Sequence, residues 1–357
     1  MQTSRNRKVS VMEEKIQAIF AVGKQSIKLP MPIYIRESAS VVGEKEGKGP
    51  LGSLFDMVGD DETFGCASWE EAESTLQKEA VTLALGKAGM EKEDVRYLLA
   101  GDLLGQTIAT SFGLRDFEIP LFGLYGACST CGETLSLGAM ILGGGFAKNV
   151  ICVTSSHFAS AEKEFRFPME YGGQRPPCAT RTVTGSGAFL LSIDKGKAPK
   201  ALITGVTTGK IVDLGVKDSF NMGCSMAPAA ADVIAANLRD FQRKPSDYDR
   251  IITGDLGKVG QQVLFELMQQ KGFDISANHM DCGMEIFDEE QKGTLSGGSG
   301  CGCAATVLSA FILKKLQDGI WKRVLFIPTG ALLNKTSFNE GQTIPGIAHA
   351  VVLESCS

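Results

Sequence analysis

The stretch GACSTCGETLSLGAMILGGGFAKNVICVTSS, residues 126–156, decides the fold because the chain contains a second version of it. The second version is GGSGCGCAATVLSAFILKKLQDGIWKRVLFIPTG, residues 297–330. Each begins with a glycine-rich turn, continues with small and apolar residues that predict a helix, and ends after a polar turn in a strand. Self-similarity over this length indicates an internal duplication.

Two further pairs of segments support the duplication. LLAGDL at 98–103 recurs as IITGDL at 251–256, and GSGAFLLSI at 185–193 is matched by GIAHAVVLE at 346–354. All the pairs follow one another in the same order, so chance is a poor explanation. We expect a flexible N-terminal extension, an N-terminal half and a C-terminal half, over residues 1–28, 29–198 and 199–357.

The pattern of apolar residues predicts how the halves are layered. Residues 129–147 and 301–317 are apolar nearly all round, which is typical of buried helices. Strands that alternate with buried helices indicate an α/β protein. We therefore predict a five-layer αβαβα sandwich, with sheets outside and the paired helices inside. Further helices are expected over 69–89, 227–242 and 260–271, with Pro228 near a helix start.

Composition excludes several classes of protein. The chain has 357 residues, of which 43% are hydrophobic and 22% charged, as in soluble globular proteins of about two domains. A net charge of −5 gives no general reason to expect nucleic-acid binding. No uninterrupted apolar run reaches the length of a transmembrane helix, so the chain is not expected to form a pore.

The extension is the most basic part of the chain. Its basic side chains outnumber its acidic ones, Glu13 and Glu14, which also interrupt any signal-peptide core. It is interpreted as a disordered leader, as sequence upstream of a true start at Met12, or as a weak contact with an anionic membrane. The basic residues are Arg5, Arg7, Lys8, Lys15, Lys24 and Lys28.

Ten cysteines are scattered along the chain, which indicates a reducing compartment and not a disulfide framework. Cys128-x-x-Cys131 and Cys301-x-Cys303 raise the alternatives of zinc or redox chemistry. However, no second C-x-x-C pair lies at the spacing of a zinc finger. We therefore expect no metal site and no cofactor.

A further set of motifs carries a family resemblance. Together with the duplicated chain and the cysteine before a buried helix, these motifs resemble the stage V sporulation protein AD family, within the thiolase-like superfamily. The resemblance covers residues 29–354. The motifs are GPLGSLFD (49–56), AGDLLGQ (100–106), GACSTCGE (126–133), VTSSH (153–157), MEYGGQRP (169–176), TVTGSGA (182–188), DLGVKDSFNMGCSMAPAAAD (213–232), TGDLGKVG (253–260), DCGM (281–284), GGSGCGCAA (297–305) and TGALL (329–333).

The resemblance implies a function connected with spores. The family is associated with dipicolinic acid, a dicarboxylate that the forespore takes up largely as its calcium chelate and that germination releases. We therefore expect a dipicolinate-binding protein, peripheral at the inner membrane of the spore or forespore, that works with membrane proteins of the same stage V group. A homodimer is also expected, because cyclic dimers are the commonest assemblies.

The resemblance also shows what condensation chemistry requires. Cys128 lies at the nucleophile position, where a helix start is expected to lower its pKa. Condensing enzymes add His/His or His/Asn partners that polarise the thioester and assist proton transfer. Those partners belong to the turns that here read Thr253-Gly254-Asp255 and Gly297-Gly298-Ser299-Gly300, which contain neither residue. The second thiolase cysteine is also missing, at Pro345-Gly346-Ile347.

We therefore expect a pseudoenzyme that binds a ligand. The turns 127–130 and 298–301 should lie face to face, each opening a buried helix with free N–H groups. A small, flat dianion suits such a site. Each helix start contributes about 0.3–1 kcal/mol, up to ~2 when partly buried. Since a micromolar complex requires about 8 kcal/mol, further contacts are needed.

Candidate contacts come from both turns and from the strand ends. Cys128 is expected to contact the ligand without catalysis, or else to fill the turn. Gly298 shapes the second turn, and Ser299, the counterpart of Cys128, is either a hydrogen-bond donor or a plain turn residue. Asp281 makes sense only near Ca²⁺, a protonated ring nitrogen or the backbone, since a bare carboxylate repels a dianion.

Asp255 and Asp102 occupy matching strand ends in the two halves. This match favours a shared structural role such as capping, although Asp255 takes the approximate place of a catalytic partner. His157 is either a ligand contact or a structural histidine with satisfied hydrogen bonds. The insertion at 157–184 has no counterpart in the second half; its Arg166, Arg175 and Arg181 suit carboxylate contacts, with Arg175 the strongest candidate, or a dimer contact.

Two other functions remain open at this stage. One is an acyl-transferring enzyme of the thiolase or ketoacyl-synthase kind that uses Cys128. The other is a scaffold that holds membrane partners and does not touch the ligand.

Overall fold

The computed structural model describes residues 20–165, 175–288 and 290–356. Ten strands form one continuous path, and two short strands extend it to a twelve-stranded mixed sheet. The first half supplies one end of this path. In spatial order its strands are β5 (Leu121–Gly123), β4 (Tyr97–Gly101), β6 (Asn149–Ser156), β8 (Gly185–Ser192) and β2 (Ser26–Val42).

The second half repeats this arrangement strand for strand. In both halves the first two pairings along the path are parallel and the next two are antiparallel. The predicted duplication is thus visible in strand order and direction. The strands of the second half are β11 (His279–Asp281), β10 (Arg250–Thr253), β13 (Arg323–Ile327), β16 (Ala350–Glu354) and β9 (Ala201–Thr207).

The halves are joined where β2 pairs antiparallel with β9. β2 is long enough to pair with β9 near its start and with β8 near its end. The predicted extension 1–28 overlaps the start of β2 and the short strand β1 (Ala21–Val22), which pairs with it. Residues 1–19 lie outside the described residues.

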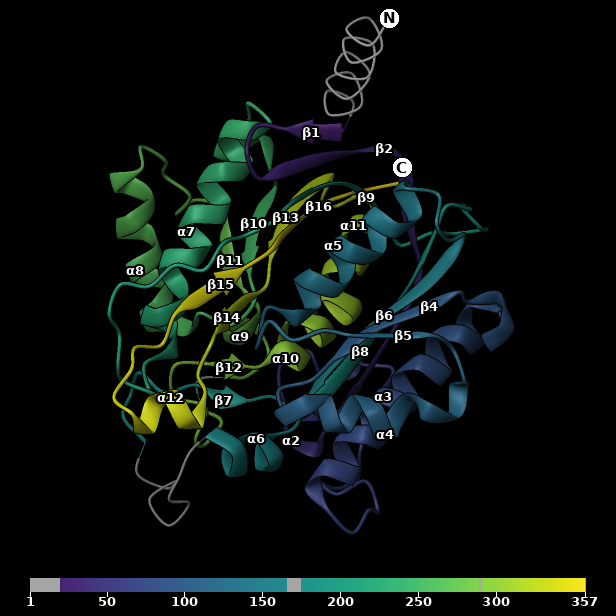
Figure 1. The fold of residues 1–357 in the computed structure, drawn as a ribbon, viewed down its shortest axis with the longest axis horizontal. Helices are drawn as coiled ribbons and strands as arrows, with labels where there is room; N and C mark the ends of the chain where they lie inside the picture. Colours follow the sequence, from purple (N-terminus) through teal and green to yellow (C-terminus); the bar gives the residue numbers. More distant parts are fainter. Residues whose placement is uncertain (1–19, 166–174, 289, 357) are drawn as a thin grey trace, which may run out of the picture.

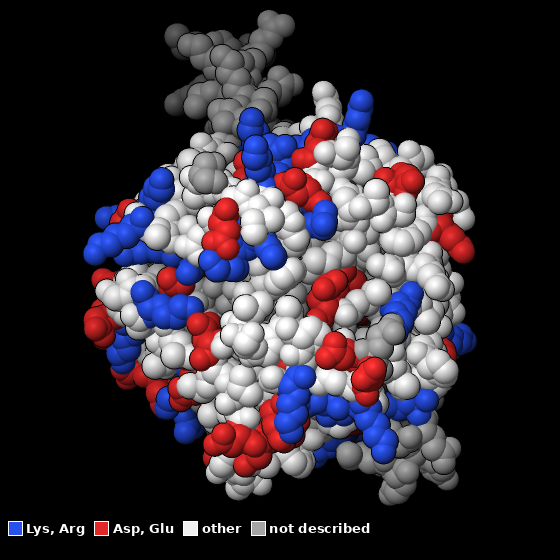
Figure 2. All heavy atoms as spheres, turned by 180° about the vertical axis from the view of Figure 1, so that it is seen from behind, with Lys and Arg blue, Asp and Glu red and all other residues white. Residues whose placement is uncertain are grey.

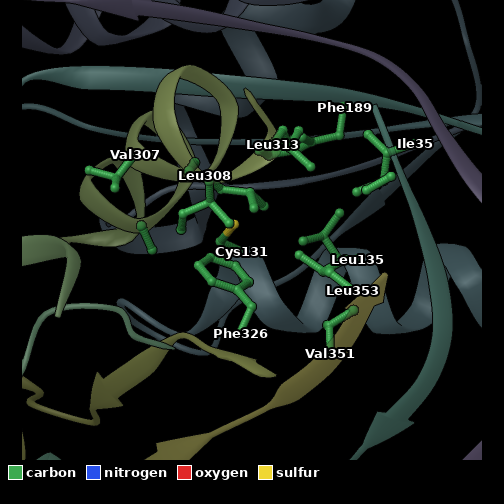
Figure 3. Packing of buried hydrophobic residues seen from close by; sticks show 14 of the residues in the cluster. Ile35, Cys131, Leu135, Phe189, Val307, Leu308, Leu313, Phe326, Val351 and Leu353 are labelled. Carbon is green, nitrogen blue, oxygen red and sulfur yellow. The ribbon is translucent and has the colours of Figure 1, made fainter. Parts of the chain in front are cut away.

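Two helical segments form the middle layer (Figure 1). They are α5 (Thr130–Gly143) and a run made of α10 (Cys301–Val307), the π-helical turn η7 (Leu308–Ile312) and α11 (Leu313–Gln317). Their side chains pack against the inner faces of the two halves of the large sheet. All of these residues belong to one core cluster, which buries Leu135, Leu308, Phe189 and Phe326 together (Figure 3). Apolar residues all round the two segments are what such a central position requires.

Two outer layers of helices cover the outer faces of the two halves of the large sheet. α3 (Trp69–Ala88) and α4 (Ile108–Leu114) lie against the first half, and α7 (Met222–Asp240) and α8 (Gly257–Gln270) against the second. Strand β6 shows the alternation that this needs, because Val150 and Cys152 face the middle layer whereas Ile151 and Val153 face α3. The predicted five-layer αβαβα fold is confirmed.

Two details of the helix predictions are wrong. α5 ends at Gly143 and not at 147, because the three successive glycines at 143–145 stop the helix. α7 starts at Met222, because the Asn221 side chain accepts from the Cys224 N–H and caps the helix there. Pro228 consequently lies inside the helix, where burial against the second sheet outweighs the lost hydrogen bond.

Short elements complete the chain and hold the loops near the middle layer. Two small sheets matter for the site, β12 paired with β7 and β14 paired with β15. None of the helices in the described part of the chain has the length and apolar character needed to cross a membrane. The short elements include α2 (Glu44–Gly47), β3 (Met57–Val58), α6 (Phe158–Phe165), β7 (Arg181–Thr182), α9 (Cys282–Glu285), β12 (Gly298–Ser299), β14 (Thr329–Ala331), α12 (Lys335–Asn339) and β15 (Gly346–Ala348).

Candidate functional site

The two glycine-rich turns meet at one small cavity, as the duplication predicts. Cys128 from the first turn and Ser299 from the second both line it. Its volume is about 30 Å³, enough for two or three water molecules at about 10–15 Å³ each. The other lining residues are Leu103, Tyr125, Ala127, Ala161, Glu162, Phe165, Thr182, Met222, Ala331 and Leu333.

The first turn is held by its own side chains. Ala127 has a φ of +50°, and the Ser129 hydroxyl donates to the Gly126 carbonyl at 2.6 Å. The Thr130 hydroxyl donates to the Ala127 carbonyl and accepts from the Gly126 N–H. Gly330 of the second half packs against this turn, so closely that a Cβ there would lie 2.3 Å from the Gly126 carbonyl oxygen. Cys128 is therefore presented to the cavity by a rigid loop.

The second turn depends on a glycine. β12 pairs with β7 and brings Ser299 beside Thr182. Gly300 has a φ of +103°, and a Cβ at this position would lie 2.5 Å from the Ser156 hydroxyl oxygen. Only glycine tolerates both constraints. Its N–H then points at the Asp255 carboxylate, 2.8 Å from Oδ2.

Asp255 occupies the corner between the two turns. It follows β10, is 1% exposed, and accepts hydrogen bonds from the Gly300 N–H and from the Thr329 hydroxyl, each at 2.8 Å. The Cys128 thiol is its third donor. Burial raises the pKa of Asp255 to about 7, although these three hydrogen bonds favour the charged form.

The expectation that a helix start lowers the pKa of Cys128 is wrong. Burial raises the pKa of this thiol well above its usual value, and the nearby Asp255 carboxylate raises it further. A hydrogen bond with the Gly300 backbone acts in the opposite direction but does not reverse the shift. The thiol is thus held in its neutral, poorly nucleophilic form.

The expectation of free N–H groups at the turns is also wrong for Ser129, Thr130 and Gly300, whose N–H groups have acceptors within the protein. The N–H groups of Ser129 and Thr130 donate to carbonyls within the first turn. Those of Gly300 and Gly302 donate to Asp255 and to the Ser156 hydroxyl. Of these N–H groups, that of Gly300 is therefore already bound by a carboxylate of the protein itself.

The three histidines lie elsewhere, with partners of their own. His157 Nε2 lies 2.7 Å from the Glu62 carbonyl oxygen and Nδ1 accepts from the Ala159 N–H, the satisfied structural arrangement. His279 bonds with the Thr253 hydroxyl and the Gln261 amide at 3.0 Å each. His349 Nδ1 accepts from the Gly209 N–H. Burial lowers the pKa of both His279 and His349 to about 4, so both are neutral near pH 7.

Asp281 and Gly298 do not line the cavity. The Asp281 carboxylate accepts from the N–H groups of Leu256 and Gly257, at the start of α8, and from the Thr253 hydroxyl at 2.6 Å. This is the backbone role among the alternatives that the sequence allowed. Gly298 lies behind the turn, where a Cβ would meet the Ile286 side chain at 2.7 Å.

The arginines of the insertion divide into three cases. Arg175 forms an ion pair with Glu162, and both side chains are at least nine-tenths buried. Glu162 lines the cavity and Arg175 does not, so Arg175 is connected with the cavity only through this ion pair. Arg181 stacks on the Phe158 ring, 3.6 Å from its centroid. Arg166 lies outside the described residues.

The paired cysteines of each motif separate in the structure. Cys128 and Cys301 belong to the small cluster at the cavity, whereas Cys131 and Cys303 pack in the central core. Figure 3 shows the Cys131 sulfur among apolar side chains that include Leu308 and Phe326. Within the described residues, no group of His, Cys, Asp and Glu is arranged to hold a metal ion.

Sequence reasoning missed most of the cavity wall. Tyr125 lies in the GLYGACSTC stretch, three residues before Cys128, and its hydroxyl donates to the Leu103 carbonyl. Phe165 and Glu162 come from α6 in the insertion, and Met222 starts α7. The one signal available was position, since Tyr125 adjoins the first turn and Met222 lies in a quoted motif.

Comparison with known proteins identifies the family. The family model described as stage V sporulation protein AD matches residues 23–354. The stage V sporulation protein AD of Bacillus subtilis (strain 168) is 45% identical over 332 residues, which cover 93% of this chain and 97% of that protein. The chain belongs to the stage V sporulation protein AD family. Membership gives this protein a role in sporulation and places it in the spore or forespore.

Solved structures that resemble this one are condensing enzymes and acyltransferases. The 3-oxoacyl-[acyl-carrier-protein] synthase III of Aquifex aeolicus VF5 is 12% identical, with a TM-score of 0.54 over 90% of this chain and 99% of that one. Human mitochondrial 3-ketoacyl-CoA thiolase is 13% identical, also with a TM-score of 0.54, over 92% and 99%. At this identity the likeness shows the thiolase fold and nothing about chemistry.

Proposed function

We propose that this protein binds dipicolinic acid, free or as its calcium chelate, at the cavity beside Cys128, and catalyses no reaction there. In this proposal it acts in dipicolinate uptake into the forespore and in its release on germination. The observation that carries the proposal is the partner of Cys128. A buried carboxylate, Asp255, adjoins the neutral thiol at the place where a condensing enzyme needs an imidazole or amide.

The cavity must widen to take such a ligand. A planar dicarboxylate needs more space than a few water molecules, so some wall side chains have to move. Tyr125 and Met222 are the natural ones, since neither is fully buried. Widening toward α6 also brings a ligand carboxylate near Arg175. The ligand carboxylate can then replace Glu162 as the bidentate partner of the Arg175 guanidinium.

Calcium decides which form of the ligand suits this wall. Glu162 presents a carboxylate to the cavity, and this repels a free dianion. A calcium chelate offers hard positive charge to the same oxygens. The proposal therefore favours the chelate over the free acid.

Isothermal titration calorimetry with dipicolinate, with and without calcium, tests the proposal on the full chain. We expect saturable binding, tighter with calcium, that is lost in Met222→Trp because the larger ring fills the cavity. Met90→Trp is the matched control, since Met90 is partly buried at the outer layer, far from the lining residues. Saturable heat of equal size from Met222→Trp, or none from the wild type, contradicts the proposal.

The same preparation tests the alternative of an acyl-transferring enzyme. Incubation with acyl-CoA thioesters followed by mass spectrometry is expected to leave Cys128 unmodified, because its thiol is neutral and buried. Stoichiometric acylation of Cys128 with turnover would establish the enzyme instead. Normal dipicolinate uptake in spores that carry Met222→Trp would favour a scaffold.

We also propose a homodimer formed through β5. This strand is the free edge of the sheet in the first half, and its Leu121 and Phe122 are 42% and 48% exposed. An apolar edge strand pairs readily with a second copy. Light scattering is expected to give a dimer for the wild type and a monomer for Phe122→Lys; a monomeric wild type contradicts the assembly.

The stage V membrane proteins and the spore inner membrane complete the proposed setting. On the face shown in Figure 2, basic and acidic side chains are interspersed around a largely uncharged middle. Such a surface favours contact with a protein partner over adsorption to anionic lipid. Flotation with anionic vesicles is expected to leave the protein unbound unless the membrane partners are present.

A further inference from the structure

Asp255 is a buried carboxylate without a cation. Three donors converge on it: the Gly300 N–H, the Thr329 hydroxyl and the Cys128 thiol. It forms no ion pair with any Lys or Arg in the described part of the chain. The titratable groups that face it come from the turn before α5 and from β11, α9 and α10, and are Cys128, Asp281, Cys282, Cys301 and Cys303.

This arrangement sets a condition on any anion that enters the cavity. Asp255 itself does not line the cavity, but the lining residue Cys128 adjoins it, so a ligand carboxylate beside Cys128 lies near the Asp255 carboxylate. Two carboxylates on either side of one buried thiol repel each other. One of them must therefore be neutralised before both can stay.

We propose that an anionic ligand enters the Cys128 cavity together with one proton, which Asp255 takes up from solvent. The inference rests on the proposed function and adds its regulation. The proton binds to a carboxylate oxygen of Asp255, and no other bond is formed or broken. Protonated Asp255 still accepts from Gly300 or Thr329 with one oxygen, and it no longer carries a charge that repels the ligand carboxylate.

The coupling predicts a pH dependence of affinity. In the free protein the pKa of Asp255 is about 7. Below that pH the carboxyl already carries the proton, and affinity is expected to be constant. Above it the affinity falls about tenfold per pH unit, since one proton must be taken up for each ligand bound. Cys128 does not contribute, because its pKa lies well above this range.

Calorimetry in two buffers of different ionisation enthalpy measures the protons taken up. At pH 8, with dipicolinate and calcium as the probe, we expect about one proton per ligand for the wild type and about none for Asp255→Asn. Asp102→Asn is the matched control, because Asp102 is the counterpart of Asp255 in the other half and should leave the uptake at one. Asp255→Asn should also bind with an affinity that does not change from pH 6 to pH 9.

The outcomes separate this inference from the proposed function. Binding with unchanged proton uptake in Asp255→Asn overturns the inference alone. Absence of heat from the wild type overturns the proposed function and the inference with it. If Asp255→Asn fails to fold, Thr329→Val replaces it: loss of one donor raises the pKa of Asp255, so the fall in affinity should begin at higher pH, and an unshifted profile overturns the coupling.

Discussion

The ends of matching strands in the two halves carry out different tasks. In the first half, Asp102 follows β4 and turns back on its own half, where it accepts from the N–H groups of Leu104 and Thr110 at 2.8 Å each. In the second half the same position, Asp255, accepts instead from Gly300 and Thr329, which lie far from it in sequence, and adjoins Cys128 of the other half. A duplicated strand end can therefore change from a structural cap into part of a site.

A second aspartate makes this change possible. The position next to the strand end on the neighbouring strand is Gly123 in the first half and Asp281 in the second. Asp281 takes over the capping of the chain that follows β10, as Asp102 does after β4. Because the local N–H groups are satisfied by Asp281, the Asp255 side chain is free to point to the turn at Gly300.

The largest expected effect comes from the difference in backbone conformation between the two glycine-rich turns. Gly300 and Ser129 are counterparts, but only Gly300 has a backbone conformation restricted to glycine. Gly300→Ala is expected to lower the free energy of unfolding by roughly 3–5 kcal/mol, from backbone strain and the contact with Ser156. Ser129→Ala removes one hydrogen bond and should lower it by about 1 kcal/mol. Equal losses in urea unfolding would contradict the asymmetry.

The sequence predicted the fold because the fold depends on repeated patterns. Alternating residues such as Val150 and Ile151, and helices apolar on every side, determine layers and strand order without any single contact. The meeting of the two turns followed from the duplication for the same reason. The family and its thiolase fold were equally accessible, since they rest on many motifs spread along the chain.

The chemistry of the site was not accessible in this way. Whether an N–H group is free depends on a single side chain that arrives from far along the sequence, as Asp255 does at Gly300. The pKa of Cys128 depends on the same contact and on burial, so the helix-start rule gave the wrong direction. The capping role of Asp281 likewise requires the pairing of β10 with β11.

The next effect concerns the two capping aspartates. Asp102→Ala and Asp281→Ala each leave buried N–H groups and a threonine hydroxyl without an acceptor. Each is expected to lower the free energy of unfolding by roughly 2–4 kcal/mol, measured by urea unfolding near pH 7. A loss below 1 kcal/mol for Asp281→Ala alone would show that the second half does not rely on it as the first relies on Asp102.

The smallest effect concerns the titration of Asp255 itself. Burial raises its pKa from the ordinary 3.8 to about 7, so between these values the folded protein binds a proton that the unfolded chain does not. The contribution of Asp255 to stability is therefore complete below pH 3.8 and lost as the pH rises through 7. At about 1.4 kcal/mol per pKa unit, the wild type should lose on the order of 2 kcal/mol through this group between pH 5 and pH 8.

Asp255→Asn removes that titration while it keeps an acceptor for the Gly300 N–H. Between pH 5 and pH 8 its free energy of unfolding should decrease less than that of the wild type. The difference between the two decreases is expected to be on the order of 2 kcal/mol. Both proteins should still lose stability above pH 7 because burial also raises the pKa of Glu73, to about 8. Parallel curves for the two proteins would mean that Asp255 is ionised in the folded state throughout, held by its three donors alone, and that its proton is not available to accompany a ligand.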